Sequence, residues 1–113
     1  MNIQIFGTKK CNDTKKAQRY FKERGIRVQY IDICDKGMSK GELRSVCQAV
    51  GGLQALINQE CKDKDALALI TYIAPSEQEE KLLENQQVIM TPVVRNGKQA
   101  TVGYAPGVWK TWA

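Results

Sequence analysis

The first third of the sequence places a cysteine between a strand and an amphipathic helix, and this order restricts the fold more than any other feature. Residues 3–6 form an apolar run that predicts a strand, which Gly7 ends. From Asp13, apolar residues recur three and four positions apart until Gly25, which predicts a helix with a glycine stop. A second apolar run within residues 27–33 predicts another strand. Because a β–α–β unit needs two parallel strands joined by a right-handed crossover, we expect an α/β fold.

Cys11 lies at the start of this first helix. A helix N-terminus carries unpaired N–H groups and about half a positive charge, so a sulfur there is favoured as a thiolate, which is a nucleophile. The alternative is that Cys11 is a small apolar filler beside a solvated basic face. The flanking lysines would lower the pKa of the thiol further by charge; they are Lys9, Lys10, Lys15 and Lys16.

Length and composition restrict the classes of function. The 113 residues suit a single domain over residues 1–113. The sequence has no histidine, which excludes every nucleophile that depends on a histidine base. The four cysteines are too dispersed for a metal site, so we expect no metal. The start of the sequence has neither a cationic leader nor a long apolar stretch. We therefore expect no membrane insertion, a cytoplasmic location and reduced thiols. The net charge of +5 suits an anionic partner.

The middle of the chain, about residues 39–85, predicts an all-helical insertion. Ser39 and Glu42 have the spacing of a capping box, and the helix that follows should end at Gly51. Residues 53–57 predict a short turn of helix, and residues 65–73 a further helix. Ser76 with Glu79 predicts a second capping box, opening a helix that runs to about residue 85.

The last third predicts a hairpin and a terminal helix. Residues 88–95 are apolar and β-branched, although Pro92 lies within them. The Asn96-Gly97 pair is a strong hairpin signal, so residues 99–102 should return antiparallel. Residues 105–112 predict a helix that buries Val108, Trp109 and Trp112 on one face. The whole chain then gives a four-stranded mixed sheet in the order βαβ, helices, ββα.

This order resembles the thioredoxin fold, with Thr91-Pro92 at the start of the hairpin strand. Four motifs are similar to those of the bacterial arsenate reductase (ArsC)/Spx family, particularly its small arsenate reductase-related branch. They are residues 7–17 (GTKKCNDTKKA), Ser39-x-x-Glu42-Leu43, residues 90–94 (MTPVV) and Val102-Gly-Tyr104.

The resemblance implies that Cys11 is the nucleophile and that Pro92 is a cis-proline beside it. It places the substrate against the loop and first helical turn and against the proline segment, namely Lys9, Lys10, Asn12, Thr14, Lys15, Thr91 and Pro92. It also implies three arginines that hold an oxyanion, but the matching positions are Thr91, Asn58 and residues 102–104. Lysines hold an oxyanion only as point charges, which weighs against arsenate as the substrate.

The Spx pattern implies a Cys-x-x-Cys switch, where this chain has Cys11-Asn-Asp-Thr14. The Thr14 hydroxyl could donate a hydrogen bond to a Cys11 thiolate. The alternative is that Thr14 is an ordinary threonine of the first helical turn. Cys34 and Cys61 are the candidates for a resolving thiol, with a bystander role as the alternative for each.

Two functions remain open at the level of the sequence. The first is a monomeric thiol-dependent oxidoreductase with Cys11 as its single nucleophile, no bound cofactor, and glutathione, another small thiol or a glutaredoxin-type reductant as co-substrate. The second is a non-catalytic, Spx-like adaptor that binds an RNA polymerase subunit, with Gly51-Gly52 at the implied contact. Direct nucleic-acid binding is disfavoured, because the basic residues are interleaved with acidic ones.

Overall fold

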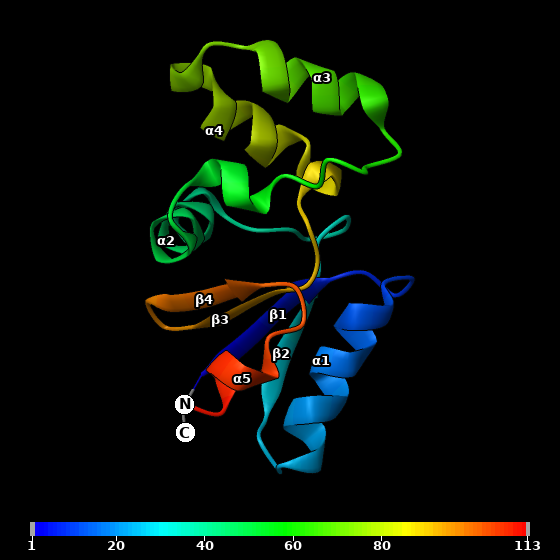
Figure 1. Cartoon of the computed structure of the whole chain (residues 1–113), viewed down its shortest axis with the longest axis vertical. Helices are drawn as coiled ribbons and strands as arrows, with labels where there is room; N and C mark the ends of the chain where they lie inside the picture. Colours follow the sequence, from blue (N-terminus) through cyan, green and yellow to red (C-terminus); the bar gives the residue numbers. More distant parts are fainter. Residues whose placement is uncertain (1, 113) are drawn as a thin grey trace.

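The computed structural model describes residues 2–112, which form a central sheet covered by helices on both faces (Figure 1). The sheet has the strand order β2-β1-β3-β4. β1 is parallel to β2 and antiparallel to β3, which is in turn antiparallel to β4, so the sheet is mixed as expected. The strands are β1 Ile3–Gly7, β2 Val28–Asp32, β3 Val93–Asn96 and β4 Gln99–Val102.

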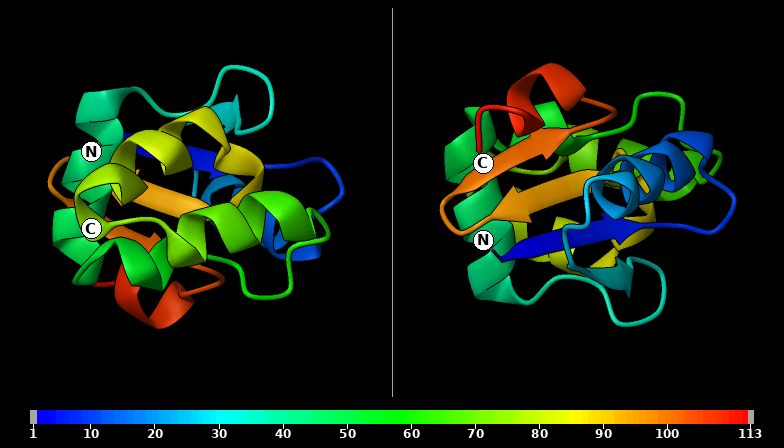
Figure 2. Two further views of the ribbon diagram at one scale, coloured as in Figure 1. Left: turned by 90° about the horizontal axis from the view of Figure 1, so that it is seen from above. Right: turned by 90° about the horizontal axis from the view of Figure 1, so that it is seen from below.

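The first and last helices, α1 and α5, cover one face of the sheet, and the three helices between them, α2, α3 and α4, lie beyond the other face (Figure 2). Two short 3-10 segments, η1 and η2, connect these helices to each other and to β3. The bounds are α1 Asn12–Glu23, α2 Lys40–Val50, η1 Leu53–Leu56, α3 Lys64–Tyr72, α4 Pro75–Glu84, η2 Gln86–Val88 and α5 Pro106–Trp109. Among these helices, none combines the length and the apolar character that a bilayer crossing requires.

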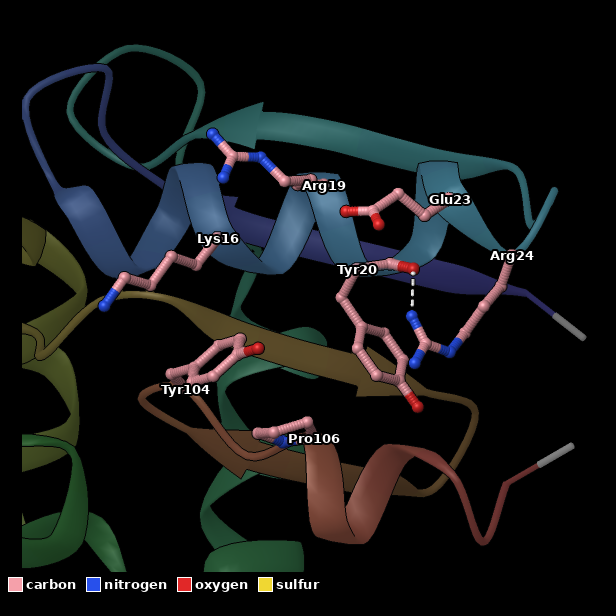
Figure 3. Close-up of a pocket in the computed structure, with 7 residues that line it drawn as sticks. All are labelled: Lys16, Arg19, Tyr20, Glu23, Arg24, Tyr104 and Pro106. Atoms are coloured by element: carbon pink, nitrogen blue, oxygen red, sulfur yellow. Dashed lines mark hydrogen bonds between the residues drawn. The ribbon is translucent and has the colours of Figure 1, made fainter.

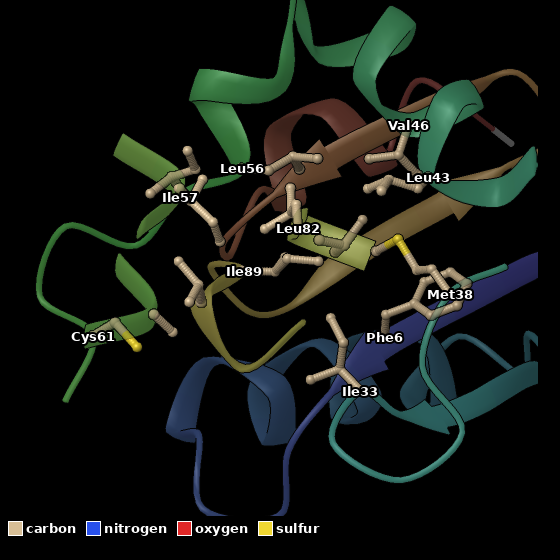
Figure 4. Packing of buried hydrophobic residues seen from close by; sticks show 14 of the residues in the cluster. Phe6, Ile33, Met38, Leu43, Val46, Leu56, Ile57, Cys61, Leu82 and Ile89 are labelled. Atoms are coloured by element: carbon tan, nitrogen blue, oxygen red, sulfur yellow. The ribbon is translucent and has the colours of Figure 1, made fainter. Parts of the chain in front are cut away.

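Two apolar clusters hold the layers together, one on each face of the sheet. The larger joins Phe6 of β1 and Val93 of β3 to the helical segment, including Leu82 of α4 (Figure 4). The smaller joins Ile5 and its neighbours to α1 and to Trp109 of α5. Adjacent residues of β1 therefore face opposite clusters, as the period of two in a strand requires. This explains why the first strand is almost wholly apolar.

Trp109 anchors the short helix α5 to the smaller cluster. Its side chain is 2% exposed, and its ring lies 5.2 Å from those of Tyr20 and Phe21. Its Nε1 donates a 2.7 Å hydrogen bond to Oγ1 of Thr101 in β4. The expectation that Val108 shares this buried face is wrong, because Val108 is 45% exposed.

Two further predictions about the second half of the chain are wrong. The strand predicted over residues 88–95 begins only at Val93, because Pro92 has no N–H to donate to a sheet and the preceding Ile89 pairs with Ile57 instead. The second capping box is absent from α4, which begins at Pro75 and has Ala74 at its N-cap. Proline at the first helical position sets this start, so Ser76 lies inside the helix.

Candidate active site

Cys11 occupies the N-cap of α1, at the edge of the sheet where β1 ends. Its backbone is extended, with φ −82° and ψ 116°, as the N-cap position requires. The side chain is partly exposed, and its Sγ donates to the carbonyl oxygen of Thr91 at 3.6 Å. The thiol is therefore accessible to solvent and also held against a segment from the far end of the chain.

That segment contains a cis peptide bond between Thr91 and Pro92. The carbonyl of Pro92 accepts a 2.8 Å hydrogen bond from the N–H of Gly103, which follows β4. Three separate parts of the sequence thus meet at one place: the start of α1, the Thr91-Pro92 turn and the end of β4. The cis-proline that the family resemblance implied beside the cysteine is confirmed.

Thr14 lies in the first turn of α1, three residues after Cys11. The residue is 1% exposed, and its hydroxyl has no hydrogen-bond partner among residues 2–112. Gly7 makes room for it, because any side chain at that position would overlap the Thr14 side chain. A buried hydroxyl without a partner costs free energy, so it is available to donate when the neighbouring sulfur becomes negatively charged.

The pKa of the Cys11 thiol is lowered from its usual value of 9.0. Burial acts in the opposite direction and is the largest single effect, but four hydrogen-bond donors together outweigh it. They are the side chains of Thr14 and Thr91 and the backbone N–H groups of Thr14 and Asp13. The two N–H groups belong to the first turn of α1, which has no intrahelical acceptor for them.

The lysines do not lower this pKa, contrary to the sequence-based expectation. The causes of the shift include none of Lys9, Lys10, Lys15 and Lys16, whose side chains are all exposed. Charges that point into solvent are screened by water and salt. Of the predicted substrate-binding residues, Thr14 and Thr91 form hydrogen bonds with Cys11, and Pro92 directly follows Thr91. The others, Lys9, Lys10, Asn12 and Lys15, are exposed in the first helical turn and the preceding loop.

The two candidate resolving cysteines differ in accessibility. Cys34 is exposed, and its pKa is raised by burial and by the neighbouring Asp32 and Cys61. Cys61 is 6% exposed, and its Sγ donates to the carbonyl of Gln87 at 3.5 Å. All four cysteines are free thiols, and neither candidate forms a hydrogen bond with Cys11 within residues 2–112.

Tyr30 is a site residue that sequence reasoning missed. Its hydroxyl is buried and has no hydrogen-bond partner within the described chain. Burial raises the pKa of Tyr30, with smaller contributions from Asp32, Cys11 and Cys34. The signal was present, because carboxyl ends of neighbouring parallel strands share one sheet edge, and Gly7 before the Cys11 loop pairs with Asp32.

Among the described residues, the three positions that the resemblance assigns to arginines form no guanidinium clamp. Of the three positions where the resemblance implies arginines, Thr91 contacts Cys11 through its carbonyl, and the Asn58 side chain accepts a local hydrogen bond from the N–H of Glu60 at 3.0 Å. The third position is the end of β4, where Gly103 contacts Pro92. Within residues 2–112 no group of three or more histidine, cysteine, aspartate or glutamate side chains is placed to hold a metal ion.

A cysteine at the start of the helix that follows β1, facing a cis-proline before a β-hairpin, defines a protein of the thioredoxin-like class. The sequence model of the ArsC family matches residues 6–112. The chain therefore belongs to the ArsC family.

Two relatives in sequence cover most of the chain. The uncharacterized protein YusI of Bacillus subtilis is 24% identical over 92% of this chain and 92% of its own length. The global transcriptional regulator Spx 2 of Oceanobacillus iheyensis is 26% identical over 92% of this chain and 78% of its own length.

Solved structures share the fold at lower identity. An ArsC family related protein from Bacteroides fragilis superposes with a TM-score of 0.85 at 20% identity, covering 100% of this chain and 98% of the other. An arsenate reductase from Vibrio cholerae gives a TM-score of 0.80 at 22% identity, covering 96% of this chain and 94% of the other. At these identities the likeness supports the thioredoxin-like fold.

Proposed function

We propose that this protein is a thiol-dependent oxidoreductase in which Cys11 is the single nucleophile. The observation that carries the proposal is the Cys11 thiol itself, which is accessible, lies at the N-cap of α1 and has a lowered pKa. Thr14 supports it, because its buried hydroxyl has no other hydrogen-bond partner within residues 2–112 and lowers the pKa of the Cys11 thiol by donating to the sulfur.

A disulfide is the substrate class that the surroundings of Cys11 favour. The Cys11 thiolate attacks the glutathione sulfur of a mixed disulfide between glutathione and a substrate thiol, forming a Cys11–glutathione disulfide and releasing the substrate sulfur as a thiolate that takes a proton from water. A second glutathione thiolate then attacks the glutathione sulfur of this adduct, which regenerates the Cys11 thiolate, releases oxidised glutathione and completes a two-electron reduction of the substrate disulfide. An oxyanion such as arsenate would need the bidentate cations that this site lacks.

The Thr91-Pro92 turn is suited to hold the substrate chain. The Thr91 N–H donates to none of the hydrogen bonds found within residues 2–112, and its carbonyl is engaged only by the Cys11 thiol. An extended peptide carrying the disulfide could pair with this backbone as a strand pairs with a sheet edge. Ionisation of Cys11 removes its proton from the Thr91 carbonyl and frees that oxygen for the incoming chain.

The direct test is turnover of a mixed disulfide between glutathione and a model peptide, followed by mass spectrometry. We expect the wild-type protein to form an adduct on Cys11 that added glutathione removes, and Cys11→Ser to form none. Cys34→Ser, Cys47→Ser and Cys61→Ser serve as matched controls and should retain the adduct. An unchanged turnover in Cys11→Ser would disprove the proposal.

An Spx-like adaptor is the second candidate, favoured by the 26% identity to Spx 2 across most of the chain. The candidate contact is Gly52, which has a φ of +132° and open space where a side chain would project. Binding to purified RNA polymerase should be lost in Gly52→Arg and retained in Cys11→Ser. Gly51→Arg is the matched control, because Gly51 also has a positive φ, of +89°, and carries similar strain.

A further inference from the structure

A groove of about 500 Å³ lies between α1 and the segment that joins β4 to α5. One wall consists of α1 side chains and of Arg24 at its C-terminal end, and the other of Tyr104 and Pro106 (Figure 3). Cys11 does not line it. We propose that this groove binds an extended acidic peptide segment of a partner protein.

The charge of the groove supports an anionic occupant. Its lining includes the cations Lys16, Arg19 and Arg24 but only one acidic side chain, Glu23. Within residues 2–112 neither Arg19 nor Arg24 forms an ion pair, and Lys16 has only a 3.9 Å contact with Asp13. The cationic groups are thus free to pair with carboxylates of a ligand.

Aromatic rings hold two of these cations in place. The Arg24 guanidinium lies 3.7 Å from the centre of the Tyr20 ring and donates to the Tyr20 carbonyl at 3.0 Å. The Lys16 ammonium lies 5.8 Å from the centre of the Tyr104 ring. Tyr104 is 44% exposed, although its ring rests edge-on against buried Trp109. Cations that are already positioned lose less side-chain entropy when a ligand binds.

The length of the groove favours a peptide over a single small anion. Lys16 and Arg24 are separated by about 12 Å along the helix, at roughly 1.5 Å per residue. An extended peptide rises about 3.3 Å per residue, so about four residues would span the two cations. A lone carboxylate would engage only one end.

Glu23 weighs against a phosphate backbone in the same groove. It lies among the cations, where a regular row of phosphates would meet it. A peptide can present a backbone N–H group to Glu23, which a nucleic acid backbone lacks.

The groove lies on the same side as the candidate active site without being part of it. Tyr104 directly follows Gly103, whose N–H bonds to the carbonyl of Pro92. A segment held between Lys16 and Tyr104 could therefore continue toward Cys11. Binding in the groove itself needs no chemistry at the sulfur and does not depend on the proposed reductase activity.

The test is fluorescence anisotropy with a labelled octapeptide of alternating glutamate and glycine, and with its glutamine counterpart. We expect the glutamate peptide to bind the wild-type protein and the glutamine peptide to bind at least tenfold more weakly. Lys16→Glu combined with Arg19→Glu should reduce the affinity for the glutamate peptide at least tenfold, and Tyr104→Ala several-fold. Cys11→Ser should bind like the wild type.

Lys22→Glu combined with Arg27→Glu is the matched control, because it makes the same change in net charge at two exposed residues that do not line the groove. An equal loss in this control would show nonspecific attraction to a basic protein and would overturn the proposal. So would equal binding of both peptides. Tighter binding of a single-stranded oligonucleotide, lost in the Lys16 and Arg19 reversal, would assign the groove to nucleic acid instead.

Discussion

At the scale of single residues, hydrogen bonds rather than cationic side chains set the state of Cys11. The donors are two N–H groups of the first turn of α1 and the side chains of Thr14 and Thr91. The sequence indicated a positive field from four nearby lysines, which the structure places in solvent. Flexible lysines cannot be positioned by sequence spacing alone, whereas a helix N-terminus has fixed geometry.

Replacement of Thr14 by valine tests the part played by its hydroxyl. Thr14→Val keeps the shape but removes the donor, so the pKa of Cys11 should rise and alkylation by iodoacetamide at pH 7 should slow several-fold. The free energy of unfolding should not fall, because the hydroxyl has no partner in the thiol form. Thr14→Ser should keep the donor. Equal alkylation rates in Thr14→Val and wild type would show that the backbone alone lowers the pKa.

The lowered pKa of Cys11 also predicts how stability depends on pH. Folding favours the thiolate, so this group contributes stability that is fully present above the unfolded value near 9.0 and is lost as the pH falls through the lower folded value. Urea unfolding of wild type and Cys11→Ser should therefore give a difference that increases in favour of wild type up to about pH 9. The raised pKa of Cys34 and Cys47 is common to both proteins and cancels in this difference. A difference that stays constant with pH would contradict the prediction.

At the scale of elements, the sequence predicted what depends on short-range chemistry. The capping box at Ser39 is present in full, with Ser39 accepting from the Glu42 N–H at 3.2 Å and Glu42 accepting from the Ser39 N–H at 2.9 Å. The Asn96-Gly97 turn joins β3 to β4 as expected. The Ser76 capping box fits the same pattern but fails, because the neighbouring Pro75 already starts the helix.

What the sequence could not supply was contact between distant segments. The groove beside α1 needs Tyr104 to lie next to Lys16, and the sulfur of Cys11 needs the Thr91 carbonyl, 80 residues away. The cis-proline was predicted from the family resemblance and not from the residues themselves. The position of Tyr30 within a strand parallel to β1 could be predicted, but the burial of its hydroxyl could not.

The two serine positions give a paired prediction for the helices. Ser39→Ala should lower the free energy of unfolding by about 1 kcal/mol, because it removes an N-cap acceptor from α2. Ser76→Ala should change it by less than about 0.5 kcal/mol, because Ser76 is exposed and inside the first turn of α4. Urea denaturation followed by far-ultraviolet circular dichroism measures both. A larger loss in Ser76→Ala than in Ser39→Ala would contradict the observed helix starts.

At the scale of the whole molecule, we expect the sheet to couple the stability of the two apolar clusters, which pack on its opposite faces. Phe6 and Val93 face the helical segment, and their neighbours Ile5 and Val94 face α1 and α5. The helical segment spanning about residues 39–85 packs on the larger cluster through several buried side chains, Leu82 among them. We therefore expect the segment to fold together with the sheet, as one cooperative unit.

Leu82→Ala tests this cooperativity from the far side of the sheet. Leu82 is fully buried, so its truncation should cost about 2–5 kcal/mol. The chain has two tryptophans, Trp109 and Trp112, which belong to the cluster on the opposite face. If the molecule is one unit, tryptophan fluorescence and far-ultraviolet circular dichroism should shift to the same lower urea midpoint in Leu82→Ala, because the sheet links the two faces. A fluorescence midpoint that stays at the wild-type value, while the helical signal is lost earlier, would show that the segment unfolds separately and that the two clusters are not coupled.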